Sequence, residues 1–440
     1  MTGPSAPRGL LRDVVELLGS TSLASAYALT TIGALFSTHV LVRLTGTAGY
    51  SAIIVGLCAL GVGILVVRRR ELTLLRLAPT TLLIFMAWLL ITASWSRSPV
   101  SSLLGWLALA GPALLAIVVA HTRDTLQTVR ATGDVLRVLL TGSLLIEVLS
   151  GILLDLPIPF LSVAGNLAEG GPIQGLFGTR TTLGLVTVLA IITFLVEWRT
   201  RSVRPGVTIF SVALAAILAL FTGSPIVLLL AFASGLATAV LAIVRRTPPH
   251  ARNTLQISIA AVLTVAAVLV VVFRRPLVYA LNAAPDFLTR SRLWNAVLDM
   301  VELQPVHGWG WFGTWTDRYL PFIQIDVNTG RAHSSALNAF IDVLLQAGWV
   351  GAVLFAVFCI LAVARAWLTA SQRRSTVYTW PALILITLLV NSIAESTVLN
   401  GFGWFLLVVC ATRSSLARGW RAGLDDAPAQ DPALPHDPRS

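Results

Sequence analysis

Apolar runs recur along almost the whole of this 440-residue chain, and they constrain its fold more than any other feature. A helix needs about 20 mostly apolar residues to cross the hydrocarbon core of a bilayer. The runs that approach this length define twelve expected spans, with the ranges 23–42, 49–67, 78–95, 100–120, 134–154, 179–197, 206–222, 224–244, 256–273, 337–364, 378–395 and 398–413. The sequence therefore predicts an all-α polytopic membrane protein with about twelve transmembrane helices.

Composition agrees with this class. Charged residues make up 12% of the chain and hydrophobic residues 56%, whereas soluble domains carry about 25% charge, and the mean hydropathy is +0.83. The net charge of +11 indicates no nucleic-acid partner, because membrane proteins place arginine in cytoplasmic loops for topological reasons. Cys58, Cys359 and Cys410 lie inside apolar runs, a placement that favours neither a disulfide framework nor a metal cluster.

The arginines divide unequally between the two sides that twelve spans define. Twenty-two of the 31 basic residues fall on the side of the two termini, and nine fall on the other. Positively charged loops stay in the cytoplasm, so both termini are expected there. No cleavable signal peptide is expected, because the first apolar run is full length. The nine arginines expected outside are Arg43, Arg97, Arg180, Arg274, Arg275, Arg290, Arg292, Arg318 and Arg331.

The spans give the chain a simple expected organisation. Its parts are a cytoplasmic segment 1–22, nine transmembrane helices within 23–273, a large extracytoplasmic loop 274–336, three transmembrane helices within 337–413 and a cytoplasmic tail 414–440. The tail is rich in Ala, Pro and Asp and is predicted to be disordered. The large loop lies between the ninth and tenth spans and is expected to contain short helices.

One short helix is predicted over 291–303 in the large loop. Its apolar residues Trp294, Val297, Leu298 and Val301 are spaced so that they share one helical face. Ser291 is the expected N-cap. The helix is expected to lie on the membrane surface or to pack over the bundle.

Arg180 is the most informative single position. It follows Gly175 and Gly178, it begins the sixth span, and Thr179 before it is able to cap the helix. A helix N-terminus attracts anions, and a guanidinium adds bidentate hydrogen bonds to phosphate. The alternative is an interfacial arginine that extends to the membrane surface, and the residues alone leave both interpretations open.

Other polar residues of the large loop allow two interpretations as well. Arg290 and Arg292 precede Trp294, and taken singly they suit a solvated or headgroup-facing arginine. His333 stands before the tenth span beside Arg331. A lone histidine is usually structural, but neutral imidazole accepts a proton near neutral pH, so His333 is a candidate base.

Acidic residues within the spans form a separate group. Glu147, Asp342 and Glu395 are functional candidates because buried charge is costly in a membrane, or they are internal pairs between helices. The residues 308–313 (GWGWFG) match a dinucleotide-binding pattern. We interpret that match as accidental, because no strand precedes it and the segment faces outward.

Four stretches together resemble the O-antigen ligase and polymerase superfamily, which are bacterial inner-membrane glycosyltransferases of the GT-C type. They are 175–184 (GLFGTRTTLG), 291–294 (SRLW), 305–310 (PVHGWG) and 332–335 (AHSS). The resemblance covers roughly residues 175–351. Ser334 follows the histidine where ligases often carry Asn, and Ser291 precedes the loop arginine where they often carry Gly.

The resemblance implies transfer of a glycan from a polyprenyl (undecaprenyl) diphosphate donor to an acceptor hydroxyl on the outer side of the bacterial cytoplasmic membrane. It implies catalytic roles for Arg180, Arg292 and His333, with His333 as base. The donor would be held by Arg180, Arg290, Arg292, Arg331 and Trp294. Arginine is permanently charged, so neither a metal nor another cofactor is expected. The expected partners are the lipid-linked donor, a glycan, lipid or wall-polymer acceptor, and the bilayer.

Three alternatives remain beside an O-antigen ligase. A polysaccharide polymerase of the same superfamily shares the donor chemistry. A twelve-span transporter or flippase of envelope precursors is the second, although many transporters place their sites near the membrane midplane between related halves. A non-catalytic membrane scaffold is the third, because one fold serves many functions.

Overall fold

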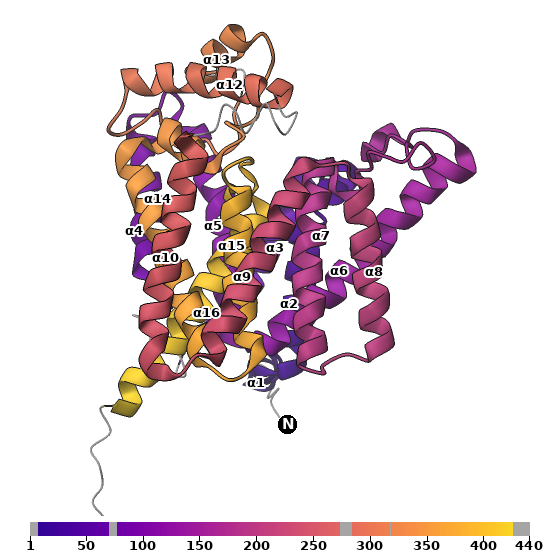
Figure 1. Ribbon diagram of the computed structural model, residues 1–440, viewed down its shortest axis with the longest axis vertical. Helices are drawn as coiled ribbons and strands as arrows, with labels where there is room; N and C mark the ends of the chain where they lie inside the picture. The colour runs from indigo at the N-terminus through magenta and orange to yellow at the C-terminus, as the bar shows by residue number, and fades with distance from the viewer. Residues whose placement is uncertain (1–7, 70–76, 273–283, 317, 426–440) are drawn as a thin grey trace, which may run out of the picture.

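The computed structural model describes residues 8–69, 77–272, 284–316 and 318–425. These ranges form helices, and no strand occurs in them beyond one isolated bridge between Ile158 and Val163. Figure 1 shows most helices side by side in one bundle. They are α1 (Arg8–Gly19), α2 (Thr21–Phe36), α3 (Thr38–Val67), α4 (Thr80–Ile91), α5 (Pro99–Thr122), α6 (Thr125–Val148), α7 (Arg180–Arg199), α8 (Pro205–Phe221), α9 (Pro225–Arg246), α10 (Pro249–Val272), α12 (Ala284–Leu303), α13 (Phe322–Thr329), α14 (Ala339–Gln372), α15 (Thr379–Asn391) and α16 (Gly401–Asp425).

Each expected span coincides with a helix, except that 23–42 is divided at Ser37 between α2 and α3. Among the described residues, six helices are long and apolar enough to cross a membrane: Thr38–Val67, Pro99–Thr122, Thr125–Leu154, Arg180–Arg199, Pro225–Arg246 and Ala339–Gln372. Five further apolar helices are shorter, with 10–17 residues. The all-α membrane class is therefore confirmed, while the count of twelve spans stays a prediction.

Large apolar side chains on the outside of the bundle agree with a lipid surrounding. Leu220 is 78% exposed, Leu228 73% and Phe232 70%. Soluble proteins rarely expose contiguous apolar surface on this scale. A bilayer would cover these side chains, whose helices α8 and α9 satisfy their own backbone groups as lipid requires.

α7 differs from the other long helices because it is largely enclosed by protein. Of its most apolar stretch, 72% is buried, against 11% for α3. It packs against α6, α8, α9 and α15. Trp380 of α15 donates its indole N–H to the hydroxyl of Thr193 on α7, at 3.0 Å. The helix that begins at Arg180 is thus held on several sides.

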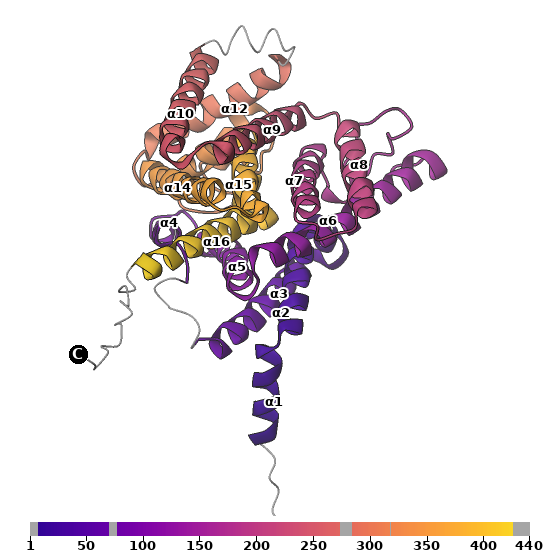
Figure 2. The same ribbon diagram turned by 60° about the horizontal axis from the view of Figure 1, so that its bottom comes forward.

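The bundle has two unlike ends. α12 and α13 lie across one end, which we call the loop end, and α1 lies at the opposite, terminal end (Figures 1 and 2). At the terminal end, three arginines that were predicted to lie inside join separate segments of the chain. Arg68 donates to Gly19 O at 3.0 Å, Arg413 donates to Thr125 Oγ1 at 3.1 Å, and Arg245 donates to Arg374 O. This grouping agrees with the predicted sidedness, while the orientation in the membrane stays a prediction.

α12 corrects the helix that was predicted for the large loop. It begins at Ala284 rather than at Ser291, so Ser291 is not its N-cap. The hydroxyl of Ser291 instead donates to Leu288 O within the helix, at 2.9 Å. Val297 and Val301 are buried as expected, but Leu298 is 42% exposed. The buried face includes Leu293 instead.

Some expectations lie outside the described residues. The first part of the predicted large loop, 274–283, is one of them, and with it Arg274 and Arg275. The last part of the predicted tail, 426–440, is another. α16 itself extends to Asp425, beyond the expected end of the last span.

Candidate functional site

α14 is broken at Gly348, where φ is 67° and ψ is −172°. The break frees backbone groups that a regular helix would pair, and a segment of the outer loop pairs them instead. The four bonds are Trp309 N to Leu345 O (3.2 Å), Gly310 N to Gln346 O (2.9 Å), Trp349 N to Pro305 O (2.8 Å) and Val350 N to Val306 O (3.3 Å). The segment 305–310 is thereby fixed on α14, because unpaired backbone groups are costly in a membrane protein.

Two glycines make this contact possible. A Cβ on Gly348 would lie 2.2 Å from the carbonyl oxygen of Val306, and a Cβ on Gly308 would lie 2.5 Å from the amide nitrogen of Gly348. Gly308 also has a φ of 68°, which disfavours other residues. The glycines of GWGWFG therefore permit close backbone packing, in agreement with the rejection of a dinucleotide site.

Asp342 fixes the tryptophan-rich segment from inside α14. Its Oδ1 accepts hydrogen bonds from Trp315 Nε1 (2.7 Å) and from Gln346 Nε2 (2.8 Å). Gln346 Oε1 in turn accepts from the backbone N–H groups of Phe312 (2.7 Å) and Gly313 (2.9 Å). This buried carboxylate thus has a structural role within the described residues.

Glu147 plays a similar part in the approach to α7. Its Oε1 accepts from the backbone N–H groups of Gln174 (2.9 Å) and Gly175 (2.7 Å). The hydroxyl of Ser143, one turn earlier on α6, accepts from Leu176 N at 3.1 Å. A carboxylate that accepts several backbone N–H groups holds them firmly. α6 therefore orients the segment that ends at Arg180.

Arg180 is the first residue of α7, and Thr179 caps the helix as predicted. The Thr179 hydroxyl accepts from Thr182 N at 3.2 Å. The side chain of Arg180 is exposed, and it forms no hydrogen bond or ion pair in the part of the chain that the structure describes. A free guanidinium at a helix N-terminus is a favourable place for an anion.

His333 is held by α13, whose Asp326 was not singled out from the sequence. His333 Nδ1 lies 3.3 Å from Asp326 Oδ1 and 3.3 Å from Thr329 Oγ1. The backbone N–H of His333 also donates to Asp326 Oδ1, at 2.9 Å. The imidazole is 8% exposed. A carboxylate beside Nδ1 favours the tautomer in which Nε2 accepts a proton.

Arg290 is engaged with the loop between α15 and α16. Its guanidinium pairs with Glu395 at 3.3 Å and donates to the carbonyl oxygens of Leu337 (3.3 Å) and Ala394. Glu395 lies beyond the end of α15, where burial raises the pKa of its carboxyl and the neighbouring Arg290 opposes that rise. These contacts tie α12 to two segments at the loop end.

The remaining predicted residues differ in their surroundings. Trp294 donates its indole N–H to Ala336 O at 2.9 Å. The side chains of Arg292 and Arg331 are exposed and form no hydrogen bond or ion pair with other described residues. Within the described ranges, no direct contact joins Arg180, Arg292 and His333 to one another.

The described residues form two cavities at the loop end. The α7 cavity, of about 370 Å³, is lined by Leu35, Phe36, Thr38, His39, Val42, Phe177, Thr182, Thr397, Asn400, Gly401 and Phe402. The α5 cavity, of about 300 Å³, is lined by Ser101, Leu104, Gly105, Ala108, Leu109, Trp311, Phe312, Gly313, Thr314, Leu399 and Asn400. Asn400 lines both, so the two cavities adjoin.

The start of α7 borders one of these cavities, and a residue next to a partner of the His333 segment borders the other. Thr182, on the first turn of α7, lines the α7 cavity, and Thr314 lines the α5 cavity. The residue after Thr314 is Trp315, whose backbone N–H donates to Ser334 O at 3.0 Å. Ser334 is the neighbour of His333. Sequence reasoning missed Asn400, which stands outside every stretch that drew attention.

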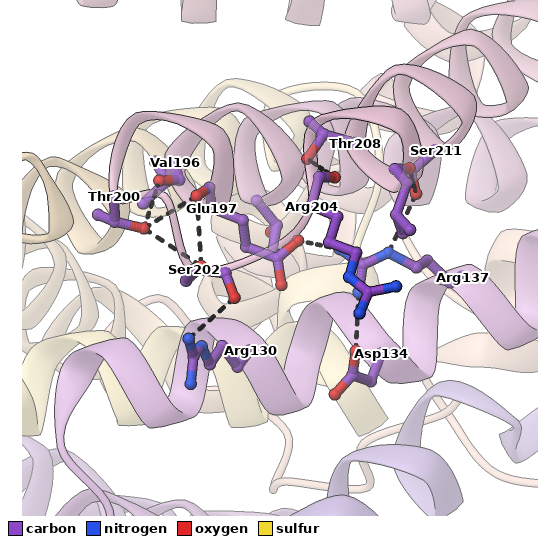
Figure 3. Close-up of polar contacts among 12 residues, drawn as sticks. Arg130, Asp134, Arg137, Val196, Glu197, Thr200, Ser202, Arg204, Thr208 and Ser211 are labelled. Atoms are coloured by element: carbon purple, nitrogen blue, oxygen red, sulfur yellow. Dashed lines mark hydrogen bonds and ion pairs between the residues drawn. The ribbon is translucent and has the colours of Figure 1, made fainter.

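A second polar cluster lies at the terminal end, where it joins α6, α7 and α8 (Figure 3). Arg137 pairs with Glu197, pairs with Asp134 at 2.7 Å and donates to Ser211 Oγ at 3.0 Å. Its guanidinium also lies over the ring of Phe194, 4.9 Å from the centroid. This cluster pairs its charges with one another.

Metal-binding side chains do not gather at either end. The described ranges contain no group of three or more His, Cys, Asp or Glu residues that could hold a metal ion. The free cationic groups at the loop end are arginines.

Comparison with known proteins adds one positive finding. A family model described as O-antigen ligase matches residues 173–356. The match begins just before the segment held by Glu147, and it ends beyond the break in α14. No curated protein matches the chain.

Proposed function

The chain belongs to the O-antigen ligase superfamily, and from this premise we propose that it transfers a glycan from a polyprenyl diphosphate carrier to an acceptor hydroxyl. The single observation that carries the proposal is the pair of adjoining cavities between the start of α7 and the segment of His333. Free arginines on α7 and α12 stand at the same end of the bundle. The proposed face is the outer face of the bacterial cytoplasmic membrane, with both termini inside.

Arg180 and Arg292 are proposed to bind the diphosphate. Nucleotide sugars are cytoplasmic, so a transferase on the outer face needs a donor that already carries a good leaving group, and a lipid diphosphate is one. Guanidinium groups bind phosphate oxygens in bidentate geometry. They also stabilise the negative charge that develops as the glycosidic bond breaks.

His333 is proposed as the base. Asp326 holds Nδ1, so Nε2 takes the proton of the acceptor hydroxyl while the hydroxyl oxygen attacks the anomeric carbon. The bond between that carbon and the diphosphate oxygen breaks, and its electron pair leaves with the polyprenyl diphosphate. Attack from the face opposite the leaving group inverts the anomeric configuration.

The other predicted residues receive supporting roles. Arg290 is occupied by Glu395 and two carbonyl oxygens, so we assign it the placement of α12, which carries Arg292. Trp294 fixes Ala336 near His333 in the same way. Arg331 is exposed and is proposed to bind the donor.

The test is glycan transfer by the purified protein in liposomes that contain a labelled undecaprenyl-diphosphate oligosaccharide. We expect the unsubstituted protein to consume the donor. Each of the variants Arg180→Ala, Arg292→Ala and His333→Ala should abolish this consumption, while the protein still inserts into the membrane. Arg43→Ala is the matched control, because Arg43 is exposed and, among the described residues, its side chain donates only to Ser162, at 3.4 Å. Full activity in any of the three variants removes that residue from the scheme.

Further outcomes separate the alternatives. Activity is expected to survive EDTA, because the proposed electrophilic groups are arginines, and a strict metal requirement would contradict this. Mass spectrometry of the products separates a ligase, which labels a different acceptor, from a polymerase, which lengthens the lipid-linked glycan. Donor that crosses the bilayer without chemical change would indicate a transporter or flippase.

A further inference from the structure

We propose that the α5 cavity binds a neutral, hydroxyl-rich part of the glycan substrate, and that the side-chain amide of Asn400 positions this part beside the base. The inference rests on the proposed function, and it adds a sugar subsite that is separate from the diphosphate site. Four observations support it: free polar side chains, an unpartnered indole, the absence of charge and fixed walls.

The free polar side chains suit a sugar. The Asn400 amide and the Thr314 hydroxyl are exposed in the cavity lining and make no side-chain hydrogen bond to other described residues. The hydroxyl of Ser101, which accepts from Ser98 Oγ at 2.8 Å, belongs to the same lining. Amides and hydroxyls both donate and accept, as do the hydroxyl groups of a glycan.

Trp311 supplies an independent sign of a ligand. Trp311 is one of the residues that line the α5 cavity, and its side chain is almost completely buried. Its indole Nε1 has no hydrogen-bond partner within the described residues. Buried donors in native proteins are nearly always paired. A ligand hydroxyl in the α5 cavity would satisfy this donor.

Charge separates the two kinds of ligand. None of the described residues that line the α5 cavity is charged, and an anion taken from water into an uncharged cavity lacks compensation. Arg180 begins the helix whose first turn borders the other cavity. The diphosphate is therefore assigned to the arginine side and the neutral sugar to the α5 cavity.

The walls of the α5 cavity are fixed before a ligand arrives. The backbone N–H of Trp311 donates to Thr92 Oγ1 at 3.0 Å, and Gln346 accepts from Phe312 and Gly313. A Cβ on Gly105 would lie 2.3 Å from Phe312 O, so α5 and the loop touch directly. Such a site loses little conformational freedom on binding.

Tyr319 supports one of the lining residues from behind. Its ring packs against that of Phe312, with centroids 5.9 Å apart. Hydrogen bonds with Ser98 and Ser101 lower the pKa of its hydroxyl. Tyr319 thus links the outer loop to the start of α5. Thr314 of the lining is followed by Trp315, which donates to Ser334 O, so we place the base close to the subsite.

Cysteine protection tests the subsite directly. Asn400→Cys and Thr314→Cys are introduced singly, and labelling by a membrane-impermeant methanethiosulfonate is followed in sealed, oriented vesicles. The native thiols lie within helices, and Cys359 and Cys410 are buried, so unsubstituted protein gives the background. Asn328→Cys is the matched control, because this exposed asparagine on α13 lines neither cavity.

Two competitors distinguish the ligand classes. One is the neutral oligosaccharide released by mild acid from the cells' own lipid-linked glycan, and the other is inorganic pyrophosphate. At about ten times its Kd, the oligosaccharide should slow labelling of both cavity cysteines about tenfold and leave Asn328→Cys unchanged. Pyrophosphate alone should leave Thr314→Cys unprotected, because Thr314 lines only the α5 cavity, whereas Asn400 borders both cavities.

Each outcome decides the inference. Equal labelling with and without oligosaccharide overturns the subsite, and so does protection of Thr314→Cys by pyrophosphate alone. Donor consumption by unsubstituted protein is measured in the same vesicles. If the donor is not consumed, the proposed function fails; if it is consumed without protection, only the sugar subsite fails.

Discussion

The loop end and the terminal end of the bundle both hold buried charges, but they use them differently. At the terminal end, Arg137 pairs with Glu197 and Asp134 and donates to Ser211, so its charge is compensated within the cluster. At the loop end, Glu147 and Asp342 hold backbone and indole groups, while the side chains of Arg180 and Arg292 have no partner among the described residues. The contrast is the reason why we propose a chemical role for the unpaired arginines and a structural one for the paired cluster.

The buried acids of the loop end explain how free charges can be placed accurately. Glu147 lies behind the approach to Arg180, and Asp342 lies behind the segment that lines the α5 cavity. Asp326 lies behind His333. Each acid accepts hydrogen bonds from a loop that would otherwise have few contacts. Groups held in this way need little reorganisation when a substrate binds.

The largest expected effect concerns His333. His333→Ala should lower glycan transfer roughly 10²–10⁴-fold, because a positioned general base contributes about that factor. Asp326→Asn should lower it less, since the imidazole remains but loses its orienting charge. Initial rates of donor consumption in liposomes give both values. A greater loss in Asp326→Asn than in His333→Ala would move the base to the carboxylate and contradict the scheme.

Arg180 follows. Arg180→Ala should lower kcat about 10²–10³-fold, which is the usual consequence of removing one group that stabilises a developing anion. Arg180→Lys should recover part of the rate, because it keeps the charge and loses the bidentate geometry. Arg43→Lys, measured in parallel, should change nothing. If Arg180→Ala raises KM for the donor and leaves kcat intact, the arginine binds the ground state only.

The terminal end should respond in stability and not in transfer. Glu197→Ala leaves Arg137 partly uncompensated, and breaking a buried ion pair costs about 3–5 kcal/mol. Thermal unfolding in detergent should show the loss, while the folded fraction keeps its kcat. Replacing both partners, as Arg137→Met with Glu197→Leu, should recover most of the stability. A loss of kcat without a lower Tm would give this cluster a part in the chemistry.

Local signals in the sequence predicted part of this arrangement. Apolar length predicted where the helices lie, and the Thr179 hydroxyl before an apolar run predicted the start of α7, because capping depends on neighbours three residues apart. The same reasoning failed at Ser291, since the helix continues back to Ala284 and a serine inside a helix bonds to a preceding carbonyl instead.

Tertiary contacts account for what the sequence could not predict. Asp326 meets His333 because α13 ends at Gly330, in a left-handed conformation that turns the chain back. Asn400 lies in both cavities because of the way in which α5, α7 and α16 pack, and the periodicity of apolar residues does not predict this packing. A lone glycine inside an apolar run usually continues a helix, so the sequence did not predict the break of α14 at Gly348 either.

The smallest effect, and the sharpest test of how the loop end is built, belongs to Glu147. Glu147→Gln keeps an oxygen that accepts from Gln174 and Gly175 but removes the charge, a weakening of about 1 kcal/mol. If all of it reached Arg180, the rate would fall about fivefold.

Glu147→Ala leaves both N–H groups unpaired and should cost more, whereas Glu169→Gln, at an exposed acid of the same outer segment, should cost nothing. Rates and donor KM are measured for all three. In the proposed scheme Glu147 acts through the backbone before α7. Its variants should therefore change the same kinetic parameter, kcat or the donor KM, as Arg180→Lys does. A change in the other parameter would mean that the carboxylate contacts the substrate itself.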